Sequence, residues 1–387
     1  FPINAMDNNV RKFPSGYLCE NCGYTASEKE AVQDCSSISS GDRVLVAKYA
    51  YHLREPRRFD IPVFKYPVEP FAATRTSDGS IDLQGMNYIK RLVGVGGKDG
   101  ETIAVFAGDL YTTGKLNYRH IPPDQQPPSE KDAWQCRYMY PNDAHALLAF
   151  QNGEFDIIRK SPEQILAMRR IVFDLDKQPK SIDDVRRRMR WQADPEHPAG
   201  WDLETAGFRH SGGDEGWMRY QHVNPWERSS DKPYLIIDHI GYNNRDDTNR
   251  PFVDGAGADR WVSDLALECT IDVPSPDSRV VLELNKGPVS CQAIFHKGEC
   301  KLVRRVRSQE AGKDDATIAM GSQPTKITSG GTYALRFANF DSRLTVWVDK
   351  KPLPFGADQS DYPPPPPTHP FTPTESDRTQ PARIGAQ

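Results

Sequence analysis

The chain has 387 residues, a formal net charge of −4 and 37% hydrophobic residues. This length suggests two or three domains, each large enough for its own core. The small negative charge and the lack of a basic block argue against a nucleic-acid partner. No apolar run reaches roughly 18 residues and no leader pattern is found, so the sequence predicts neither a membrane span nor a signal peptide.

Short β-rich runs separated by turn signals dominate the first third of the chain. Strands are expected at 44–46, 61–64, 88–95 and 102–106. Gly-Asp and Gly-Gly pairs between these runs are typical of turns. We therefore expect a compact antiparallel β domain over residues 41–115.

A helical region follows a mixed stretch that is interrupted by proline pairs. Ser161 is a plausible N-cap, and Pro162 suits the first helical position. Apolar residues then recur at helical spacing as far as Val172. A second helix is expected from Ser181 to Met189, with its basic residues toward the C-terminal end, where they suit the helix dipole.

The last third of the chain returns to strands. They are expected at 234–237, 265–273, 280–284, 293–295, 302–306, 333–337 and 344–348. Many short strands with regular turns predict a β-sandwich, and residues 335–349 resemble the hairpin of a laminin-G or concanavalin-like jelly roll. Residues 356–387, with prolines at 363–367, are predicted to be a polyproline II tail or loop.

Four short motifs occur in a fixed order within the first β region. They are Gly41-Asp42-Arg43-Val44-Leu45-Val46-Ala47-Lys48, Arg58-Phe59-Asp60-Ile61-Pro62-Val63-Phe64, Asn87-Tyr88-Ile89-Lys90-Arg91-Leu92-Val93-Gly94 and Gly108-Asp109-Leu110-Tyr111. In this order they resemble the conserved boxes of type I signal peptidases, which remove leader peptides from exported proteins. In that family the second box begins Arg-Gly-Asp.

The resemblance implies Ser/Lys chemistry with Lys90 as the general base and Arg91 in support. A neutral lysine must take the proton of the attacking hydroxyl, so it must be desolvated until its pKa approaches the working pH. A mainly apolar strand can provide that setting. The alternative from pattern alone is a solvated lysine on an edge strand.

The box that should carry the nucleophile is degenerate. Pro2 and Met6 fix its register, which puts Ala5 at the position of the nucleophilic serine and Ile3 at that of the hydroxyl that assists the oxyanion. A methyl group cannot attack a carbonyl, and isoleucine cannot donate to an oxyanion. Ser15 is a weak substitute nucleophile, and the run from Gly241 to Asp247 only partly resembles the last family box.

The loss of both hydroxyl residues predicts a signal peptidase I-like protein that is inactive with this sequence. It favours natural degeneration over an engineered inactivation, with misalignment or an unusual active enzyme as further alternatives. A non-catalytic peptide- or glycan-binding scaffold of the cell envelope is the second hypothesis. Expected partners are leader peptides, a membrane contacted through an anchor absent from this chain, and a glycan or protein for the sandwich. The chain itself is expected to be soluble, on the outer (periplasmic) face of the cytoplasmic membrane.

Seven cysteines, an odd number, cannot all pair internally. Cys19 and Cys22 form one half of a zinc knuckle, and their distance from Met6 is similar to that in planctomycete-like signal peptidases with a zinc-ribbon insert. A structural zinc bound by Cys19, Cys22 and Cys35, a disulfide among them, and free thiols all stay open, while catalysis itself would need no cofactor. In the sandwich, a Cys291–Cys300 disulfide and buried free cysteines are equally supported.

Trp217, Trp226 and Trp261 are candidates for a ligand platform, although core or rim positions are commoner for tryptophan. The predicted fold class is mainly β: a signal-peptidase-like antiparallel domain plus a jelly-roll sandwich with a short helical connector. The expected organisation is a degenerate nucleophile-box segment at 1–18, a Cys-rich zinc-knuckle-like insert at 19–40, a signal-peptidase-like core at 41–150, a helical connector at 151–230, a sandwich at 231–355 and a Pro-rich tail or loop at 356–387.

Overall fold

The computed structural model describes residues 17–18, 25–26, 45–65, 74–75, 81–82, 87–96, 101–114, 144–176, 190–204, 207–222, 232–237, 261–308, 315–365 and 371–387. The chain divides into two compact units. Unit 1 comprises Phe1–Ser39, Arg159–Pro364 and Pro370–Gln387, and unit 2 comprises Ser40–Ile158 and Pro365–His369. Each unit is described by itself.

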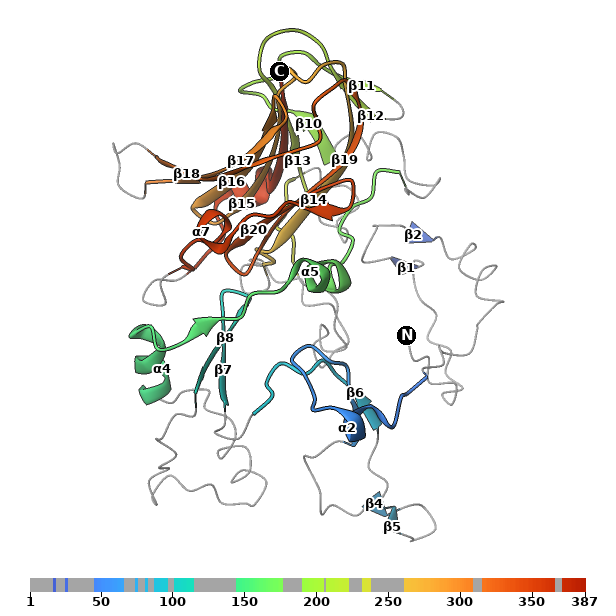
Figure 1. Ribbon diagram of the computed structural model, residues 1–387, viewed down its shortest axis with the longest axis vertical. Coiled ribbons are helices and arrows are strands. Elements are labelled where there is room, and N and C mark those ends of the chain that lie inside the picture. Colours follow the sequence, from blue (N-terminus) through green and yellow to red (C-terminus); the bar gives the residue numbers. More distant parts are fainter. Residues whose placement is uncertain are drawn as a thin grey trace. The chain divides into compact units, whose positions relative to one another are not determined.

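Unit 1 contains a sandwich of two antiparallel sheets (Figure 1). The larger sheet has the order β10 (Trp191–Ala193), β13 (Gly216–Tyr220), β22 (Ala382–Ala386), β15 (Val280–Lys286), β16 (Val289–His296), β17 (Glu299–Val306) and β18 (Ala316–Pro324). The smaller sheet has the order β14 (Leu265–Val273), β19 (Gly331–Phe340), β20 (Arg343–Val348) and β21 (Lys351–Pro352). Two further two-stranded pairs are β11 (Trp201–Glu204) with β12 (Gly207–His210), and β1 (Tyr17–Leu18) with β2 (Thr25–Ala26).

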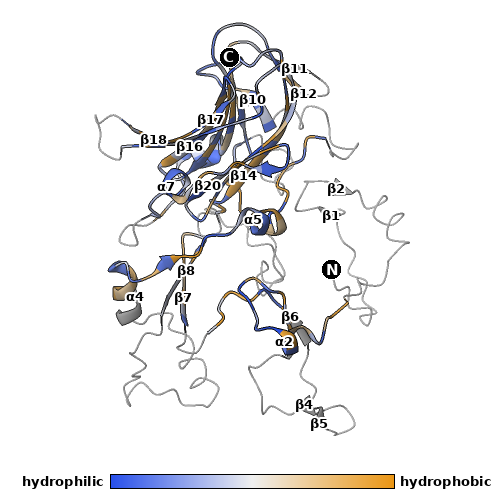
Figure 2. Ribbon diagram, viewed as in Figure 1, coloured by the Kyte–Doolittle hydropathy of each residue, from blue (hydrophilic) through white to orange (hydrophobic). Residues whose placement is uncertain are grey.

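The main hydrophobic core lies between these two sheets. In β14 alternate residues point inward, with Leu265 and Leu267 buried and their neighbours exposed. Figure 2 shows hydrophobic and hydrophilic positions mixed along the strands of the sandwich. Leu282 and Leu302 of the larger sheet join one core cluster with Phe337 of the smaller. Apolar burial of this kind supplies the main driving force for the fold.

Helices of unit 1 are short and capped. α5 (Pro162–Met168) begins after Ser161, whose hydroxyl accepts a hydrogen bond from the Gln164 amide while the Gln164 side chain accepts from the Ser161 amide. Its residue Ile165 is buried against Trp347 of β20. Two smaller helices are α7 (Ala357–Ser360) and α8 (Glu375–Thr379).

Unit 2 is built from several small antiparallel pairs. The three-stranded sheet has β7 (Glu101–Phe106), β8 (Asp109–Gly114) and β9 (Asp156–Ile157), and its aromatic core includes Tyr111 and Phe155. The other elements are the pair β3 (Val63–Lys65) and β6 (Asn87–Ile89), the pair β4 (Thr74–Arg75) and β5 (Ile81–Asp82), and the helices α2 (Ala50–Leu53) and α4 (Ala144–Gln151). Within the described ranges, none of the helices is long and apolar enough to cross a membrane.

The prediction of a mainly β protein is confirmed, and so are most of the individual strands of the sandwich. Residues 61–64 and 102–106 lie in or next to β3 and β7, and Ser161 and Pro162 open α5 as predicted. Residues 88–95 form a strand only as far as Ile89. The expected helix from Ser181 to Met189 lies outside the described residues.

Four predictions differ from the structure. Residues 45–46 are not a strand, and in 234–237 the β-pairing is an isolated bridge from Ile237 to Trp261. The helical connector is wrong for 191–220, because β10 and β13 belong to the larger sheet. The Pro-rich tail or loop is wrong at its end, because β22 lies between β13 and β15 inside that sheet.

The Cys291–Cys300 disulfide is not formed. In the β16–β17 ladder Cys291 lies opposite Arg304, and Cys300 lies opposite Phe295, so the two side chains are four ladder positions apart. Cys269, Cys291 and Cys300 are free thiols. Burial raises the pKa of Cys291 and of Cys269 to about 12, and it also raises that of Cys300.

We expect these three cysteines to resist alkylation in the native state, because the thiolate is the reactive form. Iodoacetamide at pH 8 should modify none of their tryptic peptides without denaturant and all of them in guanidinium, as read by mass spectrometry. Modification of Cys291 in the native chain would contradict the burial described for it.

Candidate functional site

Lys90 directly follows β6, on the strand that pairs with β3. In that pair Val63 lies opposite Ile89. The ladder continues beyond β6, because the Lys90 amide donates to the Pro62 carbonyl at 3.4 Å and the Leu92 amide donates to the Asp60 carbonyl at 2.8 Å. The backbone around Lys90 is therefore held against the preceding strand, while its side chain is exposed.

Arg91 contacts the turn before β3. Its guanidinium donates to the Phe59 carbonyl at 3.2 Å, and the Phe59 amide donates to the Leu92 carbonyl at 2.7 Å. Phe59 has a φ of 71°, in the left-handed region that favours glycine. The signal peptidase box that this segment resembles has glycine at this place, and a glycine would suit this left-handed backbone.

Asp60 closes the same turn. Its carboxylate accepts from the Arg54 guanidinium at 2.7 Å, from the Arg57 amide at 3.0 Å and from the Tyr51 hydroxyl at 3.4 Å. The hydrogen bond from Arg54, followed by that from the Arg57 amide, lowers the pKa of Asp60 to about 2. Asp60 therefore stays ionised near neutral pH, and its hydrogen bonds stabilise the conformation of the turn.

Glu101 at the start of β7 joins three segments of unit 2. Its carboxylate accepts from the Val95 amide at 2.8 Å and from the Thr112 hydroxyl at 2.7 Å, and it pairs with Arg58. Burial raises the pKa of Glu101, but the hydrogen bonds from Arg58, Thr112 and the Val95 amide outweigh it and hold that pKa below its ordinary value.

The other predicted site residues are not brought to Lys90 by any described contact. Ile3, Ala5 and Ser15 lie outside the described residues, as do the run from Gly241 to Asp247 and the three cysteines Cys19, Cys22 and Cys35. The side chain of Lys90 is exposed. The roles of Lys90, Arg91, Ala5 and Ile3 stay predictions.

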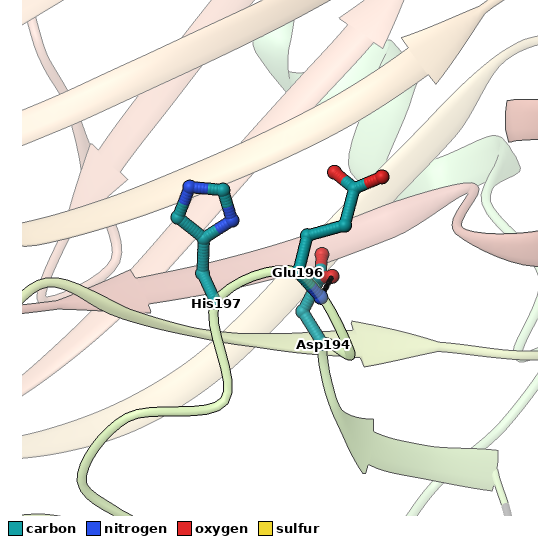
Figure 3. A group of neighbouring side chains, drawn as sticks. All are labelled: Asp194, Glu196 and His197. Atoms are coloured by element: carbon teal, nitrogen blue, oxygen red, sulfur yellow. Dashed lines mark hydrogen bonds between the residues drawn. The ribbon is translucent and has the colours of Figure 1, made fainter.

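Asp194, Glu196 and His197 form a compact group after β10 in unit 1 (Figure 3). Asp194 is buried, whereas Glu196 and His197 are exposed. One oxygen of Asp194 accepts from the Glu196 amide at 3.0 Å, and the other accepts from the Arg383 guanidinium at 2.6 Å. The guanidinium would repel a metal ion from this carboxylate, so the group is better explained as a charge-stabilised turn.

Arg383 of β22 is the centre of a buried polar network on the outer face of the larger sheet. Besides Asp194, it donates to Glu283 at 3.0 Å, and the Gln292 side chain donates to the other oxygen of Glu283 at 2.5 Å. The Arg383 guanidinium also lies 4.3 Å from the centre of the Trp217 ring. The Arg383 guanidinium thus forms ion pairs with two buried carboxylates.

The tryptophan platform is not supported by this arrangement. Trp217 is buried beneath Arg383, and its indole N–H donates to Glu215 at 2.9 Å. Trp261 packs on Phe371 with ring centres 5.2 Å apart, and Trp226 lies outside the described residues. For Trp217, core packing is the better explanation.

Two polar features of the structure have no local signal in the sequence. Glu101 was not singled out, although it follows the Gly-rich turn after the Lys90 box. Arg383 was assigned to a tail, and no local signal marks it, because its partners Asp194 and Glu283 are far away in the chain. Such contacts follow from sheet topology, which short-range patterns do not encode.

The family match falls mainly within unit 2. The family model described as "Signal peptidase, peptidase S26" matches residues 33–152. A signal peptidase I of Leptolyngbya laminosa is 35% identical over 98 residues, which cover 24% of this chain and 43% of that protein. A probable signal peptidase I-2 of Synechocystis sp. is 31% identical over 90 residues, covering 22% of this chain and 36% of that protein. The chain thus spans less than half the length of these curated relatives.

A solved structure is similar over a different share of the chain. The carbohydrate binding module CBM66 from Bacillus subtilis matches with 11% identity and a TM-score of 0.28, covering 51% of this chain and 86% of that one. No function follows from a likeness at this level. The family match, in contrast, falls on the Lys90 strands and on the compact unit that contains them. Residues 33–152 of this chain match the signal peptidase S26 family, and the curated relatives that match it are type I signal peptidases.

Proposed function

We propose that the chain is a signal peptidase I-like protein that binds the leader peptides of exported proteins without cleaving them. The proposal rests on two observations: the family match includes the Lys90 strand, and Ala5 stands where the sequence motif predicts the nucleophilic serine. Without the serine hydroxyl no acyl-enzyme can form, and Ile3 supplies no donor for an oxyanion. The role that we propose for the fold is to hold an extended peptide.

Backbone pairing is the expected mode of binding. Among the described strands, β6 pairs with β3 on one side only, so its other edge is available for an added strand. Ile89 at the end of β6 and Val93 beyond it have exposed side chains. Exposed apolar side chains beside a free strand edge suit the apolar core of a leader peptide.

The proposed location follows from the same family. Signal peptidases process exported proteins at the outer face of the cytoplasmic membrane, and their Ser/Lys chemistry needs no cofactor. We therefore place the protein at that face, with zinc at Cys19, Cys22 and Cys35 as a purely structural element. The sandwich of unit 1 would act as an accessory domain.

The test is the binding of a fluorescein-labelled leader peptide to the chain in detergent, followed by anisotropy. We expect saturable binding with no cleavage product. Ile89→Asp should weaken the binding about tenfold, a cost of about 1.4 kcal/mol, because it puts a charge beside the peptide's apolar segment. The matched control is Ile318→Asp, an exposed apolar position in unit 1. Equal loss in both variants, or no saturable binding at all, would contradict the proposal.

A further inference from the structure

The segment from Lys90 to Val95 is held from two sides. On one side, backbone hydrogen bonds join it to Asp60 and Phe59. On the other side, it meets the β7–β8 hairpin, where a side chain added at Gly94 would come within 3.3 Å of Ile103 and 3.5 Å of the Glu101 carboxylate. The contact with the β7–β8 hairpin is the less expected of the two, because it depends on charged side chains.

Arg58 supplies one half of this contact. One guanidinium nitrogen donates to the Val93 carbonyl, and the other donates to the Glu101 carboxylate. The planar fork of arginine can serve both acceptors at once, which the single ammonium of a lysine cannot reproduce. Arg58 thus joins the backbone after Lys90 to the start of β7.

Glu101 supplies the other half. Only 13% of its side chain is exposed, and it accepts from the Val95 amide as well as from Arg58 and Thr112. Among the described residues, Arg58 is the charged group that contacts it. Bonds to an ionised carboxylate are about twice as strong as neutral ones, so this contact depends on the charge of Glu101.

We propose that Arg58 and Glu101 are positioning residues that clamp the Lys90–Val95 backbone and thereby set the register in which Lys90 meets a bound peptide. The register claim rests on the proposed function, whereas the clamp itself is a property of the fold. Neither residue needs to touch the peptide. Arg58 would act through Val93, and Glu101 through Val95.

The first measurement is the protection of the Leu92 and Val95 amides against hydrogen exchange in the peptide-free chain. We expect Glu101→Gln and Arg58→Lys to lower both protection factors about tenfold or more. Glu299→Gln is the matched control, because Glu299 also accepts from a hydroxyl and pairs with a cation, but in unit 1. It should leave Leu92 and Val95 unchanged.

Two readouts separate a charge-dependent clamp from general stabilisation. The protection of Val95 in the unaltered chain should fall as the pH drops below 4.5, the ordinary pKa of the glutamate, whereas in Glu101→Gln it should not change over that range. The charge swap, Arg58→Glu with Glu101→Arg, should not restore protection, because arginine cannot accept from the Val95 amide. A swap that restores protection would overturn the clamp.

The second measurement is leader-peptide affinity, which should weaken about tenfold in Glu101→Gln. Unchanged protection in that variant would overturn the clamp even if the unaltered chain binds peptide. Lowered protection with unchanged affinity would overturn the positioning role. If the unaltered chain binds no peptide, the proposed function and the register claim fail together, while the exchange result still decides the clamp.

Discussion

Replacement of Arg383 by methionine is expected to destabilise unit 1 by about 3–5 kcal/mol. Arg383 is the shared cation of Asp194 and Glu283, and the side chains of both carboxylates are only 3% exposed. The variant keeps much of the side-chain volume but leaves two buried charges without their partner. That uncompensated desolvation, more than the loss of the ion pairs themselves, produces the large effect.

Urea denaturation followed by tryptophan fluorescence can measure this change, since every tryptophan except Trp134 lies in unit 1. Arg378→Met is the matched control. Arg378 pairs with Glu375 at 3.9 Å, and both side chains are exposed, so its loss should cost less than about 0.5 kcal/mol. An Arg383→Met variant as stable as that control would show that the network does not support the sandwich.

Replacement of Trp347 by alanine is expected to cost unit 1 a similar amount, about 3–5 kcal/mol. Trp347 is 1% exposed in β20 and packs against Ile165 of α5 and Ala338 of β19. The Arg336 guanidinium lies 5.5 Å from the centre of its ring. Removal of the ring would leave a cavity between the helix and the sheet, which rigid neighbours fill only in part.

Far-ultraviolet circular dichroism in urea measures this second effect without relying on the deleted fluorophore. Trp347→Phe should retain more than half of the lost stability, because phenylalanine fills most of the same space. If alanine and phenylalanine at this position were equally stable, the packing of α5 on the sheet would not contribute to the fold as described.

The predictable parts of this fold are those specified by local patterns. Alternating apolar residues mark β14, and Ser161 with Pro162 marks the start of α5, because period and capping act over a few residues. The parts that local patterns miss depend on pairing over long distances. β22 is short and follows a Pro-rich stretch, yet it completes the larger sheet between β13 and β15.

The candidate site also combines residues that local patterns predict with residues that they miss. Lys90 could be found because its box resembles a known family at nearly every position. Glu101 and Arg58 could not be paired from the sequence, since only the packing of β7 beside the Lys90 segment brings them together. Phe59 shows a third case, in which a left-handed turn is formed by a residue that does not favour that conformation.

The most direct test of the account is leader-peptide cleavage in detergent or lipid by three chains: the unaltered one, Ala5→Ser, and Ala5→Ser with Lys90→Ala. The account predicts no cleavage by the unaltered chain and retained peptide binding in all three. Cleavage restored by Ala5→Ser and abolished by Lys90→Ala would confirm Lys90 as the general base of a site that lacks its nucleophile. Cleavage by the unaltered chain would contradict the assignment of Ala5 and the proposal of a binding protein without peptidase activity.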